Sequence, residues 1–179
     1  MTARLKVFYR EEMVAVFKTD SPSPRKPALV VQDWQAAGLP FESVSFAPVS
    51  QEDYLLAHDP VFVEGIFSRK LQNGFFNREE QVIKSLPCTT GAMLASATDA
   101  IENQSFTCAS VFGFHHAMYA GIGVYCTFNG LIVAAQLLKK AGLASQVGIL
   151  DYDMHYGDGT DDIIQRLGLG FISHYTSGK

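Results

Sequence analysis

The sequence contains few cysteines. Only three occur in 179 residues, at Cys88, Cys108 and Cys126, and no two of them form a CxxC pair. This number and spacing exclude a disulfide framework and a zinc ribbon, and they indicate a reducing compartment. We therefore expect a cytoplasmic protein.

The sequence also lacks an excess of basic charge. Fourteen Lys and Arg residues stand against 18 Asp and Glu residues, which gives a formal net charge of −4. Nucleic-acid-binding proteins need clustered basic charge, so we expect no nucleic-acid partner. Hydrophobic residues make up 47% of the chain, which excludes a disordered tail and predicts a folded domain.

A long stretch from Asn103 to Leu138 contains no Asp, Glu, Lys or Arg. It is long enough to span a bilayer. However, it contains His115, His116, Asn129, Gln136 and four glycines, which are costly or disruptive in a lipid-facing helix. We expect a buried core segment and no membrane partner. The N-terminal residues are charged and show no apolar run typical of a signal peptide.

Strand and helix patterns alternate along the chain, which predicts a doubly wound α/β fold with a parallel sheet. A loose stretch is expected at Thr19–Pro27, and helices are expected to start near Ser50 and at Asp59-Pro60. We expect strands at Leu5–Tyr9, Ser43–Ala47, Thr107–Phe112, Gln146–Asp151 and Gly170–His174, and helices at Thr90–Ile101, Thr127–Ala141 and Thr160–Leu167.

Two polar loops follow strands of this predicted sheet. His115 and His116 follow the strand that ends at Phe112, and an Asp-rich loop follows Leu150. Ligands of open α/β sheets bind beyond the carboxyl ends of the strands. In extended backbone, Asp151, Asp153 and His155 would project from one face. Carboxylate oxygen and imidazole nitrogen are ligands for zinc, and other divalent metals stay open.

A histidine beside a metal can accept or donate the proton of an activated water. An aspartate behind the histidine fixes the tautomer of the ring, and Asp151 and Asp158 permit two such pairs. The alternatives are structural. The sequence also fits His115 and His116 as hydrogen-bonded loop histidines. It fits Asp158-Gly159-Thr160 as a helix cap and Cys126 as a small buried residue.

Four segments together resemble the histone deacetylase and acetylpolyamine amidohydrolase superfamily. They are Gly113–Ala117, Gly123–Gly130, Ile149–Thr160 and the helix opening His58-Asp59-Pro60 with Phe62-Val63, and the resemblance runs from about Glu52 to the end of the chain. It implies an arginase/deacetylase-like α/β fold, a parallel sheet flanked by helices. Residues 1–179 would then form the N-terminal portion of a single histone-deacetylase-like domain, truncated at its end.

The resemblance also implies zinc-dependent hydrolysis of an acylated amine, with one zinc per active site. Asp153 and His155 match the first two zinc ligands of the family. His116 matches its general base, and His115 matches an acid or electrostatic partner. Of the two aspartates behind them, Asp151 matches the one behind the first histidine and Asp158 the one behind the second. Acylated lysine, polyamines and small amides are the implied substrates.

Two further sites follow from the same resemblance. Tyr125 stands where the family has an aromatic wall of the acyl-lysine tunnel. A structural potassium is implied at a set of residues that bind it largely through backbone oxygens. These residues are Asp151, Asp153, His155, Ser173 and His174.

The sequence departs from the family at several positions. Tyr156 replaces a frequent histidine, and Val124 replaces a glycine before the aromatic wall. The family's third zinc ligand, an aspartate, and its transition-state tyrosine lie well downstream of the Asp-x-His motif, whereas only 24 residues follow His155 here. Two ligands hold zinc poorly, because catalytic sites normally supply three.

These departures leave a second hypothesis, a catalytically inactive fragment or binding protein with the deacetylase fold. A third hypothesis is a ureohydrolase-like manganese enzyme on the related fold, and the His-His pair and the segment at Cys126 argue against it. The last predicted strand presents an unpaired edge, which invites self-association. We therefore expect a homo-oligomer or a swapped arrangement.

Overall fold

The computed structural model describes residues 4–109 and 111–178. The chain divides into two compact units, each built from two separate segments. The first unit comprises Met1–Val49 and Glu79–Phe112, and the second comprises Ser50–Arg78 and Gly113–Lys179. All of the predicted site residues, from His115 to His174, lie in the second unit.

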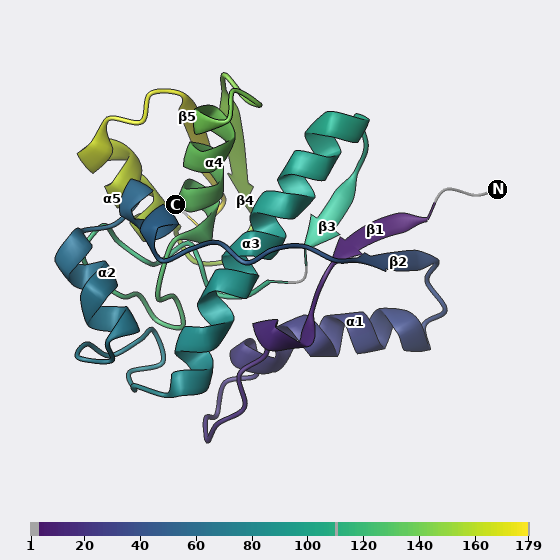
Figure 1. Cartoon of the computed structure of the whole chain (residues 1–179), viewed down its shortest axis with the longest axis horizontal. Coiled ribbons are helices and arrows are strands. Elements are labelled where there is room, and N and C mark those ends of the chain that lie inside the picture. The colour runs from purple at the N-terminus through teal and green to yellow at the C-terminus, as the bar shows by residue number, and fades with distance from the viewer. Residues whose placement is uncertain (1–3, 110, 179) are drawn as a thin grey trace. The chain divides into compact units, whose positions relative to one another are not determined.

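The first unit contains a parallel sheet of three strands with the order β2-β1-β3 (Figure 1). The long helix α3 packs against β1 and β3. Apolar side chains of Phe8, Met13 and Ala92 form a buried cluster within this unit. The bounds of its elements are β1 Leu5–Phe8, α1 Lys26–Ala36, β2 Phe41–Val44, α3 Glu80–Asn103 and β3 Thr107–Ala109.

The second unit contains a pair of parallel strands, β4 and β5, whose register places Asp151 opposite Thr176. Aromatic rings fill much of its core, where Phe128 packs against Tyr54 and Phe62. A 3-10 helix spans Glu52–Leu56. The remaining elements are α2 Pro60–Phe67, α4 Gly130–Lys140, β4 Val147–Asp151, α5 Asp158–Leu167 and β5 Ile172–Thr176.

The predicted parallel pairing is confirmed for every described strand pair. The described strands form two sheets, with β3 in one and β4 in the other, so adjacency of these two strand ends stays a prediction. The helix start at Asp59 is confirmed, because its carboxylate accepts hydrogen bonds from the backbone N–H groups of Val61 and Phe62 at 2.9 and 3.1 Å. The predicted strand Thr107–Phe112 includes Ser110, which lies outside the described residues.

The prediction of a loose stretch at Thr19–Pro27 was wrong from Ser23 onward, where a 3-10 helix, Ser23–Arg25, leads into α1. Helix α1 begins at Lys26 with Pro27 in its first turn, where a missing N–H costs nothing. Helix α3 is also longer than expected, because it continues through Pro87 from Glu80.

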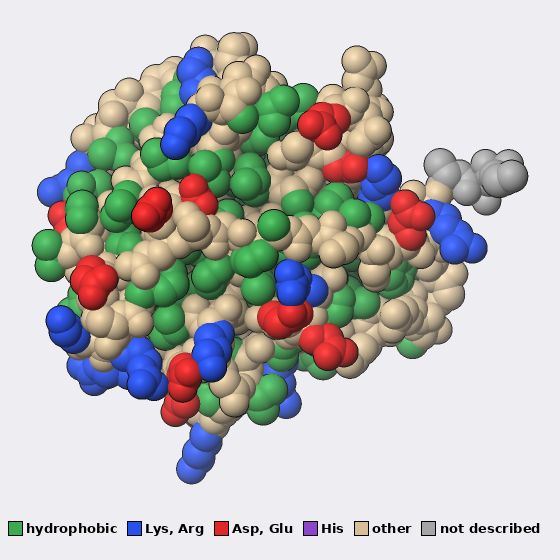
Figure 2. Space-filling model, viewed as in Figure 1, with side chains coloured by type: hydrophobic (Ala, Val, Ile, Leu, Met, Phe, Trp, Pro, Cys, Tyr) green, Lys and Arg blue, Asp and Glu red, His purple; other side chains and the backbone are tan. Residues whose placement is uncertain are grey.

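Apart from Ser110, the stretch without charged residues forms the end of α3, strand β3, loops and most of α4. Within the described part of the chain, no helix combines the length and the apolar character needed to cross a membrane. Acidic and basic side chains lie interspersed on the face drawn in Figure 2.

Candidate metal and proton-transfer site

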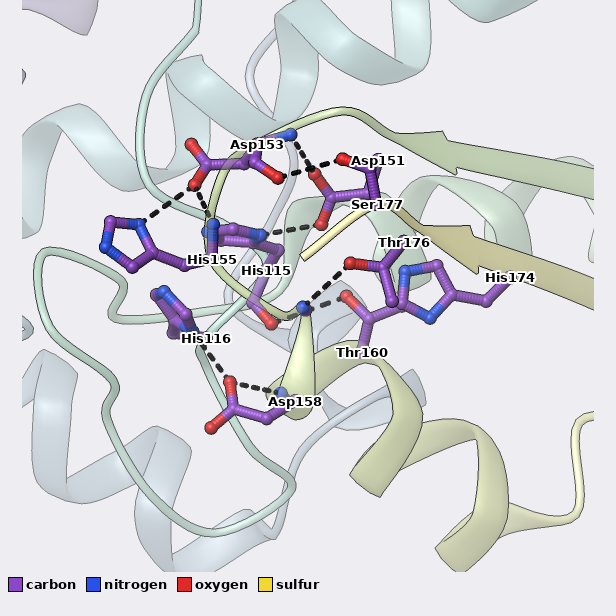
Figure 3. A network of polar contacts seen from close by, with 12 residues as sticks. His115, His116, Asp151, Asp153, His155, Asp158, Thr160, His174, Thr176 and Ser177 are labelled. Atoms are coloured by element: carbon purple, nitrogen blue, oxygen red, sulfur yellow. Dashed lines mark hydrogen bonds and ion pairs between the residues drawn. The ribbon is translucent and has the colours of Figure 1, made fainter. Parts of the chain in front are cut away.

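Two histidine–aspartate pairs connect the polar loops of the second unit. The Nδ1 atom of His115 lies 2.6 Å from Asp151 Oδ2, and Nδ1 of His116 lies 2.6 Å from Asp158 Oδ1 (Figure 3). A carboxylate can only accept a hydrogen bond, so each ring carries its proton on Nδ1. The Nε2 atom of each neutral ring is then left as a proton acceptor.

The two pairs differ in burial. The side chains of His115 and Asp151 are 15% and 10% exposed, whereas those of His116 and Asp158 are 21% and 43% exposed. The ring centroids of the two histidines lie only 4.1 Å apart. The two rings are therefore close enough for a charge on one to act on the other.

The loop after β4 brings Asp151, Asp153 and His155 together through two successive turns. Asp151 Oδ1 accepts from the Asp153 N–H at 3.0 Å, and Asp153 Oδ1 accepts from the His155 N–H at 2.9 Å. The extended backbone expected from the sequence is therefore replaced by two Asx turns. The backbone hydrogen bond from His155 lowers the pKa of the Asp153 carboxyl below its ordinary value.

The Asp153 and His155 side chains also approach each other directly. Asp153 Oδ1 lies 3.0 Å from His155 Nδ1, and both side chains are exposed. Zinc takes oxygen and nitrogen ligands at about 2.0 to 2.2 Å in tetrahedral geometry, which sets two ligand atoms roughly 3.3 Å apart. The donor types and their spacing thus fit two ligands of one divalent metal.

A third ligand is missing from the part of the chain that the structure describes. Among residues 4–109 and 111–178, no group of three His, Cys, Asp or Glu side chains is arranged to hold a metal. The ring of His116 lies 5.9 Å from that of His155, so the proton-transfer pair adjoins the two ligands.

Close approach by two glycines fixes the backbone of His116. A Cβ on Gly159 would lie 2.4 Å from the His116 carbonyl carbon, and a Cβ on Gly123 would lie 2.3 Å from the His116 Cβ. Neither position can accept a side chain without movement of this backbone. Gly159 appeared in the sequence only as part of a helix cap, and its packing role could not be inferred there.

Tyr125 lies in the tight turn between Gly123 and Cys126, next to the contact with His116. Its φ of +60° is unusual for a side chain other than glycine. The Tyr125 N–H donates to the Gly74 carbonyl at 2.8 Å, and its ring centroid lies 5.6 Å from that of Phe75. A role as a tunnel wall stays a prediction.

The residues named for a potassium site lie on the paired strands β4 and β5 and in the loop after β4. The structure brings Asp151, Asp153 and His155 together but places Ser173 opposite Gly148, away from this loop. The loop instead contacts Ser177, whose hydroxyl donates to the Asp153 carbonyl at 3.1 Å.

His174 takes part in a different cluster. Its side chain is 2% exposed, and its Nδ1 lies 2.6 Å from Asp161 Oδ1. The other oxygen of Asp161 accepts a hydrogen bond from the Tyr156 hydroxyl. Tyr156, the residue that replaces a frequent histidine, therefore binds the same carboxylate as His174. The potassium site itself stays a prediction.

Sequence reasoning missed a buried polar group behind the site. His58, Asn129 and Thr160 are each 0% exposed and are connected by hydrogen bonds. Burial lowers the pKa of His58 to about 4. The motif His58-Asp59-Pro60 was the available signal, but it points to a helix start and gives no indication of a long-range contact.

Comparison with known proteins gives consistent matches. The profile of the histone deacetylase domain matches residues 22–177. The acetylpolyamine amidohydrolase of Mycoplana ramosa is 34% identical over 150 residues, which are 78% of this chain and 40% of that protein. Acetylpolyamine amidohydrolase 2 of Pseudomonas aeruginosa is 32% identical over 143 residues, which are 74% of this chain and 38% of that protein.

A crystal structure of the HDA15 HD domain matches the fold with a TM-score of 0.79 and 20% identity. That match covers 96% of this chain and 53% of the HDA15 chain. The chain thus spans about two fifths of the length of the two relatives and about half of the solved structure. The fold is confirmed as parallel strands flanked by helices, as in a histone deacetylase domain.

Proposed function

Because the chain belongs to the histone deacetylase family, we propose that it supplies the metal-binding and proton-transfer part of an enzyme that hydrolyses acylated amines. The observation that carries this proposal is the placement of the two His–Asp pairs next to Asp153 Oδ1 and His155 Nδ1. One divalent metal, zinc by the donor set, is the cofactor that these residues would hold.

A bound zinc would lower the pKa of water and polarise the acyl carbonyl. Residues of the chain itself accept and donate the proton. His116 Nε2 accepts a proton from the attacking water, because its Nδ1 is occupied by the hydrogen bond to Asp158. Asp158 then stabilises the positive ring, and the same proton passes to the leaving amine.

His115 acts beside this pair. Its more buried hydrogen bond to Asp151 keeps its ring fixed, and its ring centroid lies 4.1 Å from that of His116. We assign His115 an electrostatic role, because a ring at this distance acts on the charge that His116 gains with the proton. Acetyl-lysine, acetylpolyamines and small amides are the proposed substrate class, and the names of the two relatives favour acetylpolyamines.

A second candidate is a deacetylase-fold protein that binds an acylated amine without hydrolysing it. The observation that favours it is the lack of a group of three metal-binding side chains among the described residues. Turnover separates the two candidates, because binding without a complete site would leave the substrate intact.

The test is hydrolysis of an acetyl-lysine peptide and an N-acetylated diamine by the purified chain with added zinc. The proposed enzyme would release acetate, and Asp158→Asn would reduce the rate because the proton on His116 would move to the other ring nitrogen. Glu42→Gln in the first unit is the matched control and should leave the rate unchanged. Substrate binding without acetate release would support the second candidate.

We also propose that the protein is cytoplasmic and self-associates. The number and the wide spacing of the cysteines in the sequence support the first point. Strand β5 supports the second, because its described pairing is with β4 alone. Gel filtration that gave a monomer would contradict self-association, and fractionation of cells would test the location.

A further inference from the structure

Three buried polar side chains form a hydrogen-bonded network next to the segment that carries His115 and His116. His58, Asn129 and Thr160 come from three segments far apart in the sequence, and each is fully buried. Buried polar groups are normally hydrogen-bonded, and fully satisfied networks specify a single local structure. The partners of these three residues therefore indicate which part of the backbone they hold.

His58 binds the C-terminal end of the segment His115–Met118. Its Nδ1 lies 2.9 Å from the Met118 carbonyl oxygen, and its Nε2 lies 2.9 Å from the Asn129 backbone nitrogen. Since the carbonyl accepts and the N–H donates, the ring is neutral, with its proton on Nδ1. Both ring nitrogens are thus used, and rotation of the ring would break both hydrogen bonds.

Thr160 binds the N-terminal end of the same segment, at His115. Its backbone N–H donates to the His115 carbonyl oxygen at 3.0 Å. Its hydroxyl oxygen accepts from Asn129 Nδ2 at 2.9 Å, so Asn129 connects Thr160 to His58. Asn129 is itself fixed, because it caps α4 by accepting from the Ile132 N–H.

The two ends of the segment His115–Met118 are therefore attached to one continuous network. Between them, Gly123 and Gly159 approach His116 so closely that a Cβ on either glycine would clash with it. The direction of each imidazole is set by its Cα–Cβ bond and by its aspartate partner. A shift of this backbone would lengthen both 2.6 Å contacts.

We propose that His58, Asn129 and Thr160 form a positioning unit that aims the His115 and His116 rings at their aspartates. None of the three touches the reacting atoms, so they are positioning residues and not catalytic ones. Their value for catalysis rests on the proposed function, whereas their effect on the two rings is a property of the folded chain and is measurable without turnover.

The network could instead stabilise the core without affecting the rings, and the test must separate these roles. Proton NMR of the full chain, with ¹⁵N-labelled histidine, detects the Nδ1–H protons of His115 and His116 as strongly downfield signals. Thr160→Val removes the hydroxyl at nearly constant shape, and Thr160→Ser restores it. Leu138→Ala, in the buried face of α4, is a control that loses core packing at a distance from the network.

The proposal predicts that Thr160→Val shifts or broadens the downfield signals, that Thr160→Ser restores them, and that Leu138→Ala leaves them in place. Unchanged signals in a folded Thr160→Val variant would overturn it. The same change in Leu138→Ala, or no restoration by Thr160→Ser, would also overturn it. A chain with the predicted signals but without hydrolytic activity would contradict the proposed function and leave the positioning unit intact.

Discussion

Acidification from pH 7 to pH 4 is expected to destabilise the second unit through His58. The folded structure holds this ring neutral, because it is fully buried and its Nε2 accepts a hydrogen bond from the Asn129 N–H. A proton on Nε2 would break that bond and place a charge in the aromatic core formed with Phe62 and Phe128.

The magnitude follows from the two pKa values. The pKa of His58 is about 4 in the folded state, against an ordinary value of 6.5 for a histidine in the unfolded chain. As the pH falls, the unfolded state binds the proton first. The stabilising contribution of the neutral His58, which is complete above pH 6.5, is therefore lost progressively between pH 6.5 and pH 4. The loss attributable to His58 is about 2 kcal/mol at pH 5 and about 3 kcal/mol at pH 4, where the total stability of a domain is about 5 to 15 kcal/mol.

Urea denaturation followed by circular dichroism at pH 7, 5 and 4 measures this loss. His58→Gln is the comparison, because it has no titrating group at this position and should show a flatter dependence on pH than the natural chain. Parallel loss of stability in the two proteins would refute the reasoning. An NMR titration that gave a pKa near 6.5 for the His58 ring in the folded protein would refute it as well.

Two other substitutions test the packing around the site. Gly159→Ala should cost roughly 1 to 3 kcal/mol of unfolding free energy, because its methyl group would meet the His116 backbone. Gly170→Ala, where a Cβ meets nothing within 4 Å, should cost far less, and equal losses would contradict the close-packing argument. Tyr156→Phe should cost about 1 to 3 kcal/mol through the lost hydrogen bond to a carboxylate. The exposed Tyr152→Phe should cost under about 0.5 kcal/mol. Urea denaturation at pH 7 measures all four variants, and an unchanged stability of Tyr156→Phe would show that its hydrogen bond contributes nothing.

Local patterns in the sequence predicted the elements that carry the site. The apolar run before Asp151 predicted β4, and Asp59 before Pro60 predicted the start of α2, because strand burial and helix caps depend on neighbouring residues. The His–Asp partners came from the family resemblance. The structure places His115 and His116 against the aspartates named for them.

Apart from the two His–Asp pairs, contacts between distant segments could not be inferred from the sequence. Nothing in the sequence around Asp161, for example, indicates that its carboxylate contacts His174 of strand β5. The register of β5, which places Ser173 opposite Gly148 and His174 opposite Ile149, could not be inferred either. Register depends on side-chain packing between the strands, and a shift of a few residues changes every partner.

Zinc binding to the purified chain tests the central claim most directly. Titration calorimetry at pH 7, with elemental analysis of the gel-filtered protein, gives the stoichiometry and the affinity. The site predicts one zinc per chain, held more weakly than by three ligands and lost in both Asp153→Ala and His155→Ala. Asp20→Ala in the first unit should bind zinc like the natural chain. Absence of binding, or binding that survives both site substitutions, would contradict a metal site at Asp153 and His155.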